Sequence, residues 1–218
     1  MSSSLLPYVE RLPRQQGEGK PPLLVLLHGR DAYGETIFSV EHLLPASFHI
    51  VSIRATYTSP REGYEWYKPY DYDRPLESFG EEHFRESLDT VTPMIASLLE
   101  EKDVDTEKLF LLGFSQGAAM CHFLGLEGKL KPKGVVPMSG FFPRPIEKWA
   151  NINTEAEFLI THGSEDKVLS TSESIYALDF LRRNHISSDY YEYKGRHKMT
   201  TPLLKHISLW LIERSIEV

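Results

Sequence analysis

The sequence predicts an α/β fold, in which a mostly parallel central sheet is covered by helices on both faces. Short apolar runs alternate along the chain with longer amphipathic segments, which is the pattern of strands joined by crossover helices. The strand candidates are so apolar that each needs cover on both faces. A chain of 218 residues can bury one substantial core but is short for two. We therefore expect residues 1–218 to form one domain.

Strands are expected at the apolar runs that are too short to be helices: 23–28, 48–54, 109–114, 134–139, 157–162 and 188–193. The longer helices are expected at 82–102, 116–125, 171–184 and 200–214, with a short helix near 35–44. Pro93 falls inside the first long helix, where its missing N–H predicts a kink or a break. The long segment without clear periodicity is 55–81.

The composition limits which partners the protein is expected to bind and in which cellular compartment it is expected to work. The net charge is −7, and lysine and arginine are scattered rather than clustered, which argues against a nucleic acid or an anionic membrane as partner. A single cysteine, Cys121, excludes an intramolecular disulfide and favours a reducing compartment. The first residues lack the features of a secretory signal, and no run approaches the roughly 18 apolar residues of a membrane span. These features predict a cytoplasmic protein without integral membrane association.

The run "LFLLGFSQGAAM", residues 109–120, places Ser115 at a corner between a buried strand and a helix. It contains the pattern G-x-S-x-G, the nucleophile elbow. Flanking glycines let the strand and the helix approach closely, and the turn exposes the serine hydroxyl at the carboxyl edge of the sheet. The helix that follows directs its amino end, with its backbone N–H groups, at the same place. The motif predicts a nucleophilic serine.

A serine nucleophile needs a base, and the base needs an acid that holds its tautomer. In "FLITHGSEDKVLS", Asp166 follows a predicted strand by a few residues, and in "YYEYKGRHKMT", His197 follows the last strand in the same way. The carboxyl ends of parallel strands share one edge, where open α/β sheets bind ligands. The order Ser…Asp…His is that of α/β hydrolases, so Ser115, Asp166 and His197 are the predicted catalytic residues.

Other candidates are weaker. Glu165 neighbours Asp166, but H-G-x-x-D-x-V as a unit selects the aspartate. Among the nine histidines, His28 and His162 precede glycines at strand ends and are interpreted as hydrogen-bonding turn residues. Ser139 lacks a preceding glycine and is interpreted as a lining or packing residue. Cys121 lies within the helix after the elbow and is expected to be a buried small hydrophobe.

The segments "LLHGR", "GFSQGAAM", "THGSEDKV" and the late "GRH" resemble the phospholipase/carboxylesterase family of the α/β hydrolases, which includes bacterial carboxylesterases and acyl-protein thioesterases. The resemblance extends from about Pro21 to Leu211. It implies an α/β-hydrolase fold and a serine hydrolase that acts on small-molecule esters or thioesters without a cofactor. No metal-binding pattern is present either.

The resemblance also implies an oxyanion hole, formed by the backbone N–H groups of Arg30 and Gln116. Relatives usually carry an apolar residue at the position of Arg30 and a glycine at that of Arg196. One hypothesis is that Arg30 favours a substrate with a negative charge or a polar acyl end. The alternative is that Arg30 pairs in solvent with Asp31 or Glu35.

Candidate pocket residues lie in three segments. The aromatic-rich segment 57–79 contains Trp66 and Tyr67, which resemble an aromatic position that relatives place beside the active site, and it is expected to form a wall of the acyl pocket or to pack on the sheet edge. Phe141, in a Phe-Phe pair, is expected in the pocket, in a homodimer contact or in the core. Met199, two residues after the predicted base, is a further pocket candidate.

Fewer than twenty residues separate the strand that ends near Ser139 from the strand that begins near 157, so no separate cap domain is expected. An open site predicts short- to medium-chain carboxylic esters as substrates. An acyl thioesterase or lysophospholipase activity on the same site remains an alternative, as does a peptidase or dienelactone-type hydrolase. A ligand-binding protein without activity is less favoured.

Overall fold

The computed structural model describes residues 6–17, 19–69, 71, 79–144, 146–149, 152 and 154–216. Its strands are β1 (Tyr8–Arg11), β2 (Pro22–Leu27), β3 (His49–Ile53), β4 (Tyr57–Thr58), β5 (Tyr64–Glu65), β6 (Asp105–Phe114), β7 (Gly134–Met138), β8 (Glu157–Gly163) and β9 (Ser188–Tyr193). Its helices are α1 (Gly34–Phe38), α2 (Glu81–Glu101), α3 (Gln116–Leu126), α4 (Ile146–Trp149), α5 (Thr171–Arg183) and α6 (Thr201–Ser215), with a short 3₁₀ helix at Glu41–Leu43.

The central sheet confirms the predicted fold class. Its strands are ordered β1-β3-β2-β6-β7-β8-β9, and every neighbouring pair is parallel except β1 and β3. All six predicted strands lie in this sheet. The edge strand β1 was not predicted, because its four residues, YVER, carry too short an apolar pattern. Between β7 and β8 the described residues form one short helix, α4.

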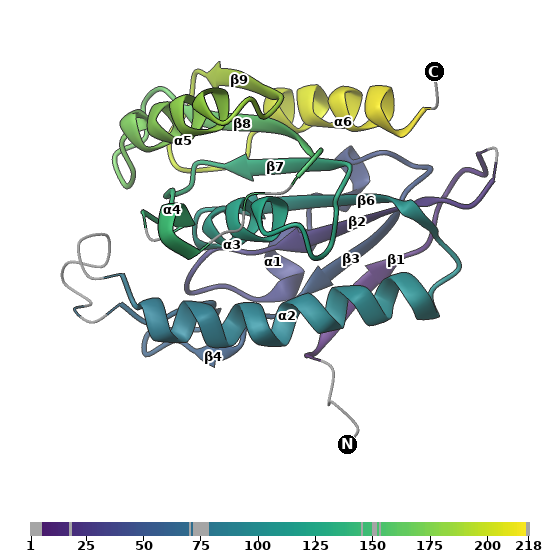
Figure 1. The fold of residues 1–218 in the computed structure, drawn as a ribbon. Coiled ribbons are helices and arrows are strands. Elements are labelled where there is room, and N and C mark those ends of the chain that lie inside the picture. The colour runs from purple at the N-terminus through teal and green to yellow at the C-terminus, as the bar shows by residue number, and fades with distance from the viewer. Residues whose placement is uncertain are drawn as a thin grey trace.

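Two apolar layers sandwich the sheet. Along β2, Leu23, Val25 and Leu27 belong to the layer that includes side chains of α2, α3 and α5. Leu24 and Leu26 belong to the other layer, which includes side chains of α1 and α6. This alternation follows from the two-residue period of a strand and explains why β2 is apolar throughout. Figure 1 shows α2 and α3 crossing one face of the sheet.

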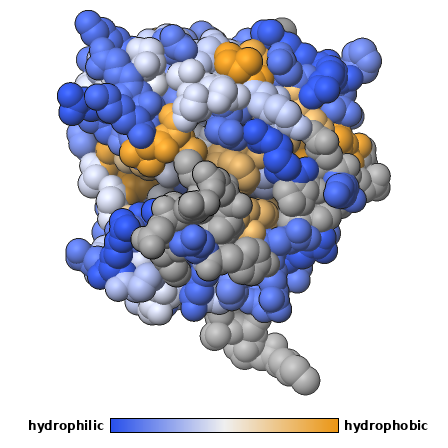
Figure 2. Space-filling view, turned by 90° about the vertical axis from the view of Figure 1, so that its left-hand side faces the viewer, coloured by the Kyte–Doolittle hydropathy of each residue, from blue (hydrophilic) through white to orange (hydrophobic). Residues whose placement is uncertain are grey.

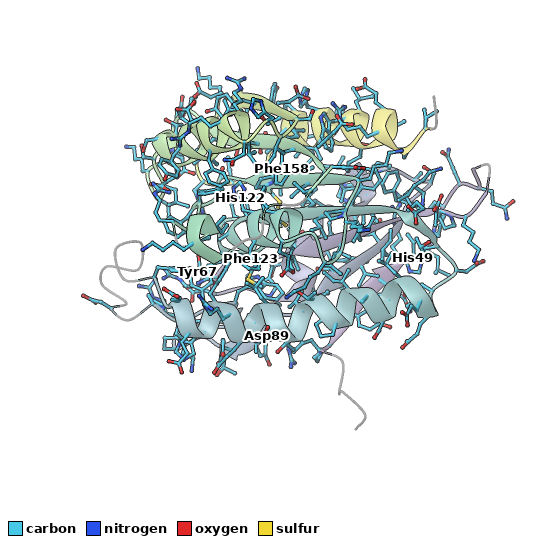
Figure 3. All side chains as sticks on the ribbon, viewed as in Figure 1. His49, Tyr67, Asp89, His122, Phe123 and Phe158 are labelled. Carbon is cyan, nitrogen blue, oxygen red and sulfur yellow. The ribbon has the colours of Figure 1, made fainter. Side chains whose placement is uncertain are left out.

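Helix α3 is fully buried, and it carries the polar side chain of His122 into the first layer. The His122 ring stacks against Phe158 of β8, with 6.4 Å between ring centroids and 10° between planes. Figure 3 shows both residues near the middle of the molecule. Burial lowers the pKa of His122 to about 3, so the ring is packed as a neutral group.

Helix α2 continues through Pro93, so of the two predicted outcomes, a kink or a break, the break is wrong. A proline at this position removes the hydrogen bond to the carbonyl of Asp89, four residues earlier. Both residues are exposed, and Asp89 lies on the outer side of α2 in Figure 3. Water can therefore replace the lost donor. None of the described helices is both long enough and apolar enough to cross a membrane.

Candidate active site

Ser115 occupies the turn between β6 and α3 in a conformation that side chains rarely adopt. Its φ is 55° and its ψ is −113°, and such strained backbone is typical of functional sites. The glycines on either side explain the motif. A Cβ on Gly113 would lie 2.2 Å from the carbonyl oxygen of Gly117, and a Cβ on Gly117 would lie 2.0 Å from that of Leu27. Only glycine permits these close approaches.

The structure brings the three predicted catalytic side chains together as one hydrogen-bonded chain. Nε2 of His197 lies 3.0 Å from Oγ of Ser115, and Nδ1 of His197 lies 2.7 Å from Oδ2 of Asp166. The serine follows β6, the aspartate follows β8 and the histidine follows β9. The three loops meet because β6, β7, β8 and β9 are parallel neighbours and end at the same edge.

Asp166 is held as a buried, fully hydrogen-bonded carboxylate. Its side chain has no exposed surface, and its Oδ1 accepts hydrogen bonds from the N–H groups of Val168 (2.8 Å) and Leu169 (3.0 Å). Burial alone would raise the pKa of Asp166, but the N–H of Leu169, the hydrogen bond from His197 and the N–H of Val168 together lower it below its ordinary value. The carboxyl is therefore charged near neutral pH and can orient a histidine.

The buried ring of His162 lies next to this carboxylate, a position that the sequence did not indicate. Its Nε2 lies 3.1 Å from the carbonyl oxygen of Leu169 and 3.4 Å from Oδ2 of Asp166, so Nε2 carries the proton. Its Nδ1 accepts from the hydroxyl of Ser174 at 2.7 Å. Burial lowers the pKa of His162. The neutral ring donates to the catalytic loop without adding positive charge.

The two residues expected to supply oxyanion donors flank Ser115. Gln116 is the first residue of α3, a position whose N–H has no acceptor within the helix. Arg30 follows Gly29, and a Cβ on Gly29 would lie 3.3 Å from Cβ of Ser115. The chain after β2 therefore passes directly beside the serine. Both N–H groups belong to segments in contact with the elbow.

The side chain of Arg30 is only about one quarter exposed, and its Nε lies 3.6 Å from Oδ2 of Asp31. The same carboxylate oxygen lies 3.8 Å from Nη1 of Arg61, and its partner oxygen accepts a hydrogen bond from the hydroxyl of Ser59. The predicted pairing with Asp31 is present. Two guanidinium groups therefore share this one carboxylate.

The structure does not support a pocket wall formed by Trp66 and Tyr67. Trp66 has no exposed surface, and Tyr67 is 5% exposed. The Tyr67 ring packs edge-on against Phe79 and Phe84, with centroids 5.0 and 5.5 Å away. Trp66 and Tyr67 are therefore part of the core, where each removes a large apolar area from water. Within the expected wall, residues 70 and 72–78 lie outside the described part of the chain.

Phe141 and Met199 are both partly buried, and they pack against different apolar layers. Phe141 lies 5.6 Å from Phe79, ring to ring. In the layer that Met199 contacts, the ring of Phe114 lies 4.8 Å from that of His197.

Figure 2 views the side of the molecule to which the β7 arrow points in Figure 1, and shows hydrophobic patches among hydrophilic side chains. Apolar surface is therefore available at this edge.

The weaker candidates occupy other environments. Ser139 is fully buried, with its Oγ 3.4 Å from the hydroxyl oxygen of Tyr193. Cys121 is fully buried, and burial raises the pKa of its thiol. His28 hydrogen-bonds the carbonyl of its neighbour Gly29, as expected of a turn residue, and its ring also accepts from the N–H of Ala55, 27 residues away. Glu165 is exposed, unlike the buried carboxylate of Asp166.

Curated proteins of similar sequence include acyl-protein thioesterases. The chain is 29% identical over 140 residues to acyl-protein thioesterase 1 homolog 1 of Dictyostelium discoideum, and 26% identical over 142 residues to acyl-protein thioesterase 1 of Saccharomyces cerevisiae. The first match covers 62% of each protein, and the second covers 63% of this chain and 62% of the yeast protein. The chain thus spans about three fifths of the length of these curated relatives.

Solved structures extend the likeness to almost the whole chain. Esterase PE8 is 26% identical, with a TM-score of 0.79 over 96% of this chain and 98% of that protein. The Bacillus cereus carboxylesterase shares the fold, with a TM-score of 0.83 over 98% of this chain and 96% of that protein at 16% identity. The profile of the family described as Phospholipase/Carboxylesterase matches residues 14–212. The chain therefore belongs to the phospholipase/carboxylesterase family of α/β hydrolases.

Proposed function

We propose that this protein is a serine carboxylesterase that hydrolyses short- to medium-chain carboxylic esters through an acyl-enzyme. One observation carries the proposal: the unbroken hydrogen-bonded chain from Ser115 through His197 to the buried carboxylate of Asp166, with the serine on a strained elbow. A positioned base and an orienting acid are the requirements for activating a serine hydroxyl.

The geometry supports a two-step reaction. Oγ of Ser115 attacks the acyl carbon while its proton passes to Nε2 of His197. The backbone N–H groups of Arg30 and Gln116 hold the oxyanion of the tetrahedral intermediate. The intermediate collapses, and the alcohol leaves with the proton from His197. Water then attacks the acyl carbon as its proton passes to His197, and the second tetrahedral intermediate releases the carboxylic acid while His197 returns the proton to Oγ of Ser115.

The substrate range follows from the surroundings of the serine. Between β7 and β8 the described residues form only the short helix α4, so those residues supply no helical cap. Partly buried Phe141 and Met199 offer apolar contacts to an acyl chain of modest length. A small-molecule ester that reaches the site from solvent fits this arrangement.

A rate panel of p-nitrophenyl esters from acetate to palmitate tests the proposal, with Ser115→Ala measured beside the wild type. We expect a maximum at short or medium chains and a loss of at least about 10³-fold in the variant. A fluorophosphonate should label the wild type at one site per chain. Rates that are independent of Ser115 would overturn the proposal, and ligand binding without turnover would indicate a non-enzymatic role.

A thioesterase activity is the second candidate, because the named relatives are acyl-protein thioesterases. The same nucleophile and oxyanion donors serve an oxoester and a thioester, since only the leaving atom differs. Parallel rates on p-nitrophenyl butyrate and on a butyryl thioester of equal chain length distinguish the two. A thioester preference of more than about tenfold in kcat/KM, equivalent to about 1.4 kcal/mol, would favour the thioesterase.

A further inference from the structure

We propose that Trp66, together with the side chain of Gln116, forms a positioning network that holds the two oxyanion N–H groups at a fixed separation. The inference rests on the proposed function, because it assumes that Arg30 and Gln116 supply those groups. It replaces the expected wall role of Trp66 with a role inside the protein.

The first part of the network ties Gln116 to the segment after β5. The amide of Gln116 accepts a hydrogen bond from the backbone N–H of Trp66 at 2.9 Å and donates one to the carbonyl of Tyr67 at 2.8 Å. One acceptor and one donor determine which way the amide points. The residue whose N–H faces the elbow is therefore fixed by its side chain as well as by helix α3.

The second part ties Trp66 to the chain beside Arg30. The indole Nε1–H donates to the carbonyl of His28 at 2.7 Å, and the two rings lie 5.4 Å apart. The hydroxyl of Ser87, on α2, donates to the carbonyl of Trp66. The N–H, C=O and indole N–H of Trp66 thus each bind a different segment. A buried side chain satisfied at every polar group holds one conformation.

The third part of the network fixes the direction of the Arg30 N–H through the ring of His28. The N–H of Ala55 donates to Nε2 of His28 at 2.9 Å, so the proton of the neutral ring lies on Nδ1. Nδ1 donates to the carbonyl of Gly29 at 2.6 Å. That carbonyl and the Arg30 N–H belong to one planar peptide unit and point in opposite directions. Holding the Gly29 oxygen therefore aims the Arg30 N–H.

Because Gln116 and His28 are both bonded to Trp66, the two candidate donors share one rigid connection. Donors that are fixed before the reaction stabilise an oxyanion without reorganising. The connection is specific to the oxyanion and does not include His197 or Asp166. Its loss should therefore weaken transition-state stabilisation while leaving the base and the acid in place.

The test compares Trp66→Phe with wild type on an oxoester and the matching thionoester, p-nitrophenyl butyrate and its C=S analogue. Phenylalanine retains an aromatic ring but removes the indole N–H. Donors arranged for oxygen favour the oxoester, because sulfur is larger and accepts hydrogen bonds weakly. We expect kcat for the oxoester to fall about tenfold, a fraction of the roughly 10²–10³-fold cost of losing one donor outright. The oxoester-to-thionoester rate ratio should fall about fivefold, with KM within about twofold of wild type.

Trp210→Phe is the matched control, because the indole of Trp210 donates to Oδ2 of Asp189 at 3.1 Å and Trp210 is also almost fully buried. This variant loses the same N–H and should keep the wild-type rate ratio. A Trp66→Phe protein with an unchanged ratio, or with both rates reduced equally, would overturn the network. If Trp66→Phe does not fold, Gln116→Met tests the other link with the same readout. Wild-type turnover that does not depend on Ser115 would instead refute the proposed function.

Discussion

Nε2 of His162 lies 3.4 Å from Oδ2 of Asp166, the carboxylate oxygen that also binds Nδ1 of His197. The N–H of this buried, neutral ring donates to the carbonyl of Leu169 and also lies close to the carboxylate. We predict that His162→Phe lowers kcat about tenfold with little change in KM, because it removes the hydrogen bond to the carbonyl of Leu169 and the N–H dipole that lies close to the charged carboxylate of Asp166. Steady-state kinetics with p-nitrophenyl butyrate measure the effect.

His122→Phe is the comparison for that prediction. His122 is equally buried, but it packs against Phe142 and Phe158. The His122→Phe variant should therefore retain the wild-type kcat. Equal losses in the two variants would show that His162 acts only through the stability of the fold, and denaturant unfolding of both proteins would separate stability from rate.

The free energy of unfolding should fall between pH 6.5 and 4, a range in which most carboxyl groups are still charged. Burial lowers the pKa of His28 to about 4 and that of His122 to about 3, whereas both titrate near 6.5 in an unfolded chain. Below pH 6.5 the unfolded chain binds protons that the folded protein does not, so the free energy of unfolding falls as the pH falls toward 4. Each such histidine contributes a slope of up to about 1.4 kcal/mol per pH unit.

Urea unfolding between pH 6.5 and 4.5 measures this slope. His122→Phe should reduce it by up to about 1.4 kcal/mol per pH unit, because one proton-binding group is removed from the unfolded chain. The same slope in the variant and the wild type would contradict the assignment of a neutral, buried His122.

Gly117→Ala should disrupt the elbow. The added methyl would lie 2.0 Å from the carbonyl oxygen of Leu27 and 2.7 Å from that of His28. Both obstacles are backbone, so relief requires α3 to move away from β2. We predict a loss of about 3 kcal/mol, at the upper end of overpacking costs, measured by urea unfolding. Gly17→Ala, where nothing lies within 4 Å, should change stability by less than about 1 kcal/mol.

Arg30→Leu should reduce any preference for anionic substrates. Arg30 and Arg61 share the carboxylate of Asp31, and the backbone of Arg30 belongs to the segment that passes beside the serine. We predict that kcat/KM for the p-nitrophenyl hemiester of glutaric acid falls about threefold relative to the neutral butyrate ester, as expected for a partly exposed charge. Added salt should reduce the same ratio in the wild type. An unchanged ratio in the variant would show that Arg30 serves only its pairing with Asp31.

The segment 55–81 marks the limit of prediction from sequence. Its aromatic residues suggested a surface that contacts substrate, yet Trp66 and Tyr67 are buried. A pattern without periodicity does not show which face a side chain takes, since that depends on what packs against it. Strand β1 was missed for a related reason: its partner, β3, lies about forty residues further along the chain, and pairing across that distance leaves little local signal.

Local sequence patterns were enough to predict the alternation of strands and helices, the elbow at Ser115 and the chain order of the serine, the acid and the base. These features follow from local hydrophobic periods and from steric demands on glycine, which neighbouring residues express directly. Two contacts of the site cannot be predicted from local patterns: His197 reaches Ser115 from 82 positions away, and the side chain of Gln116 binds the backbone of Trp66, 50 positions away. Each contact joins segments that are distant in the chain, so it exists only once the sheet has assembled.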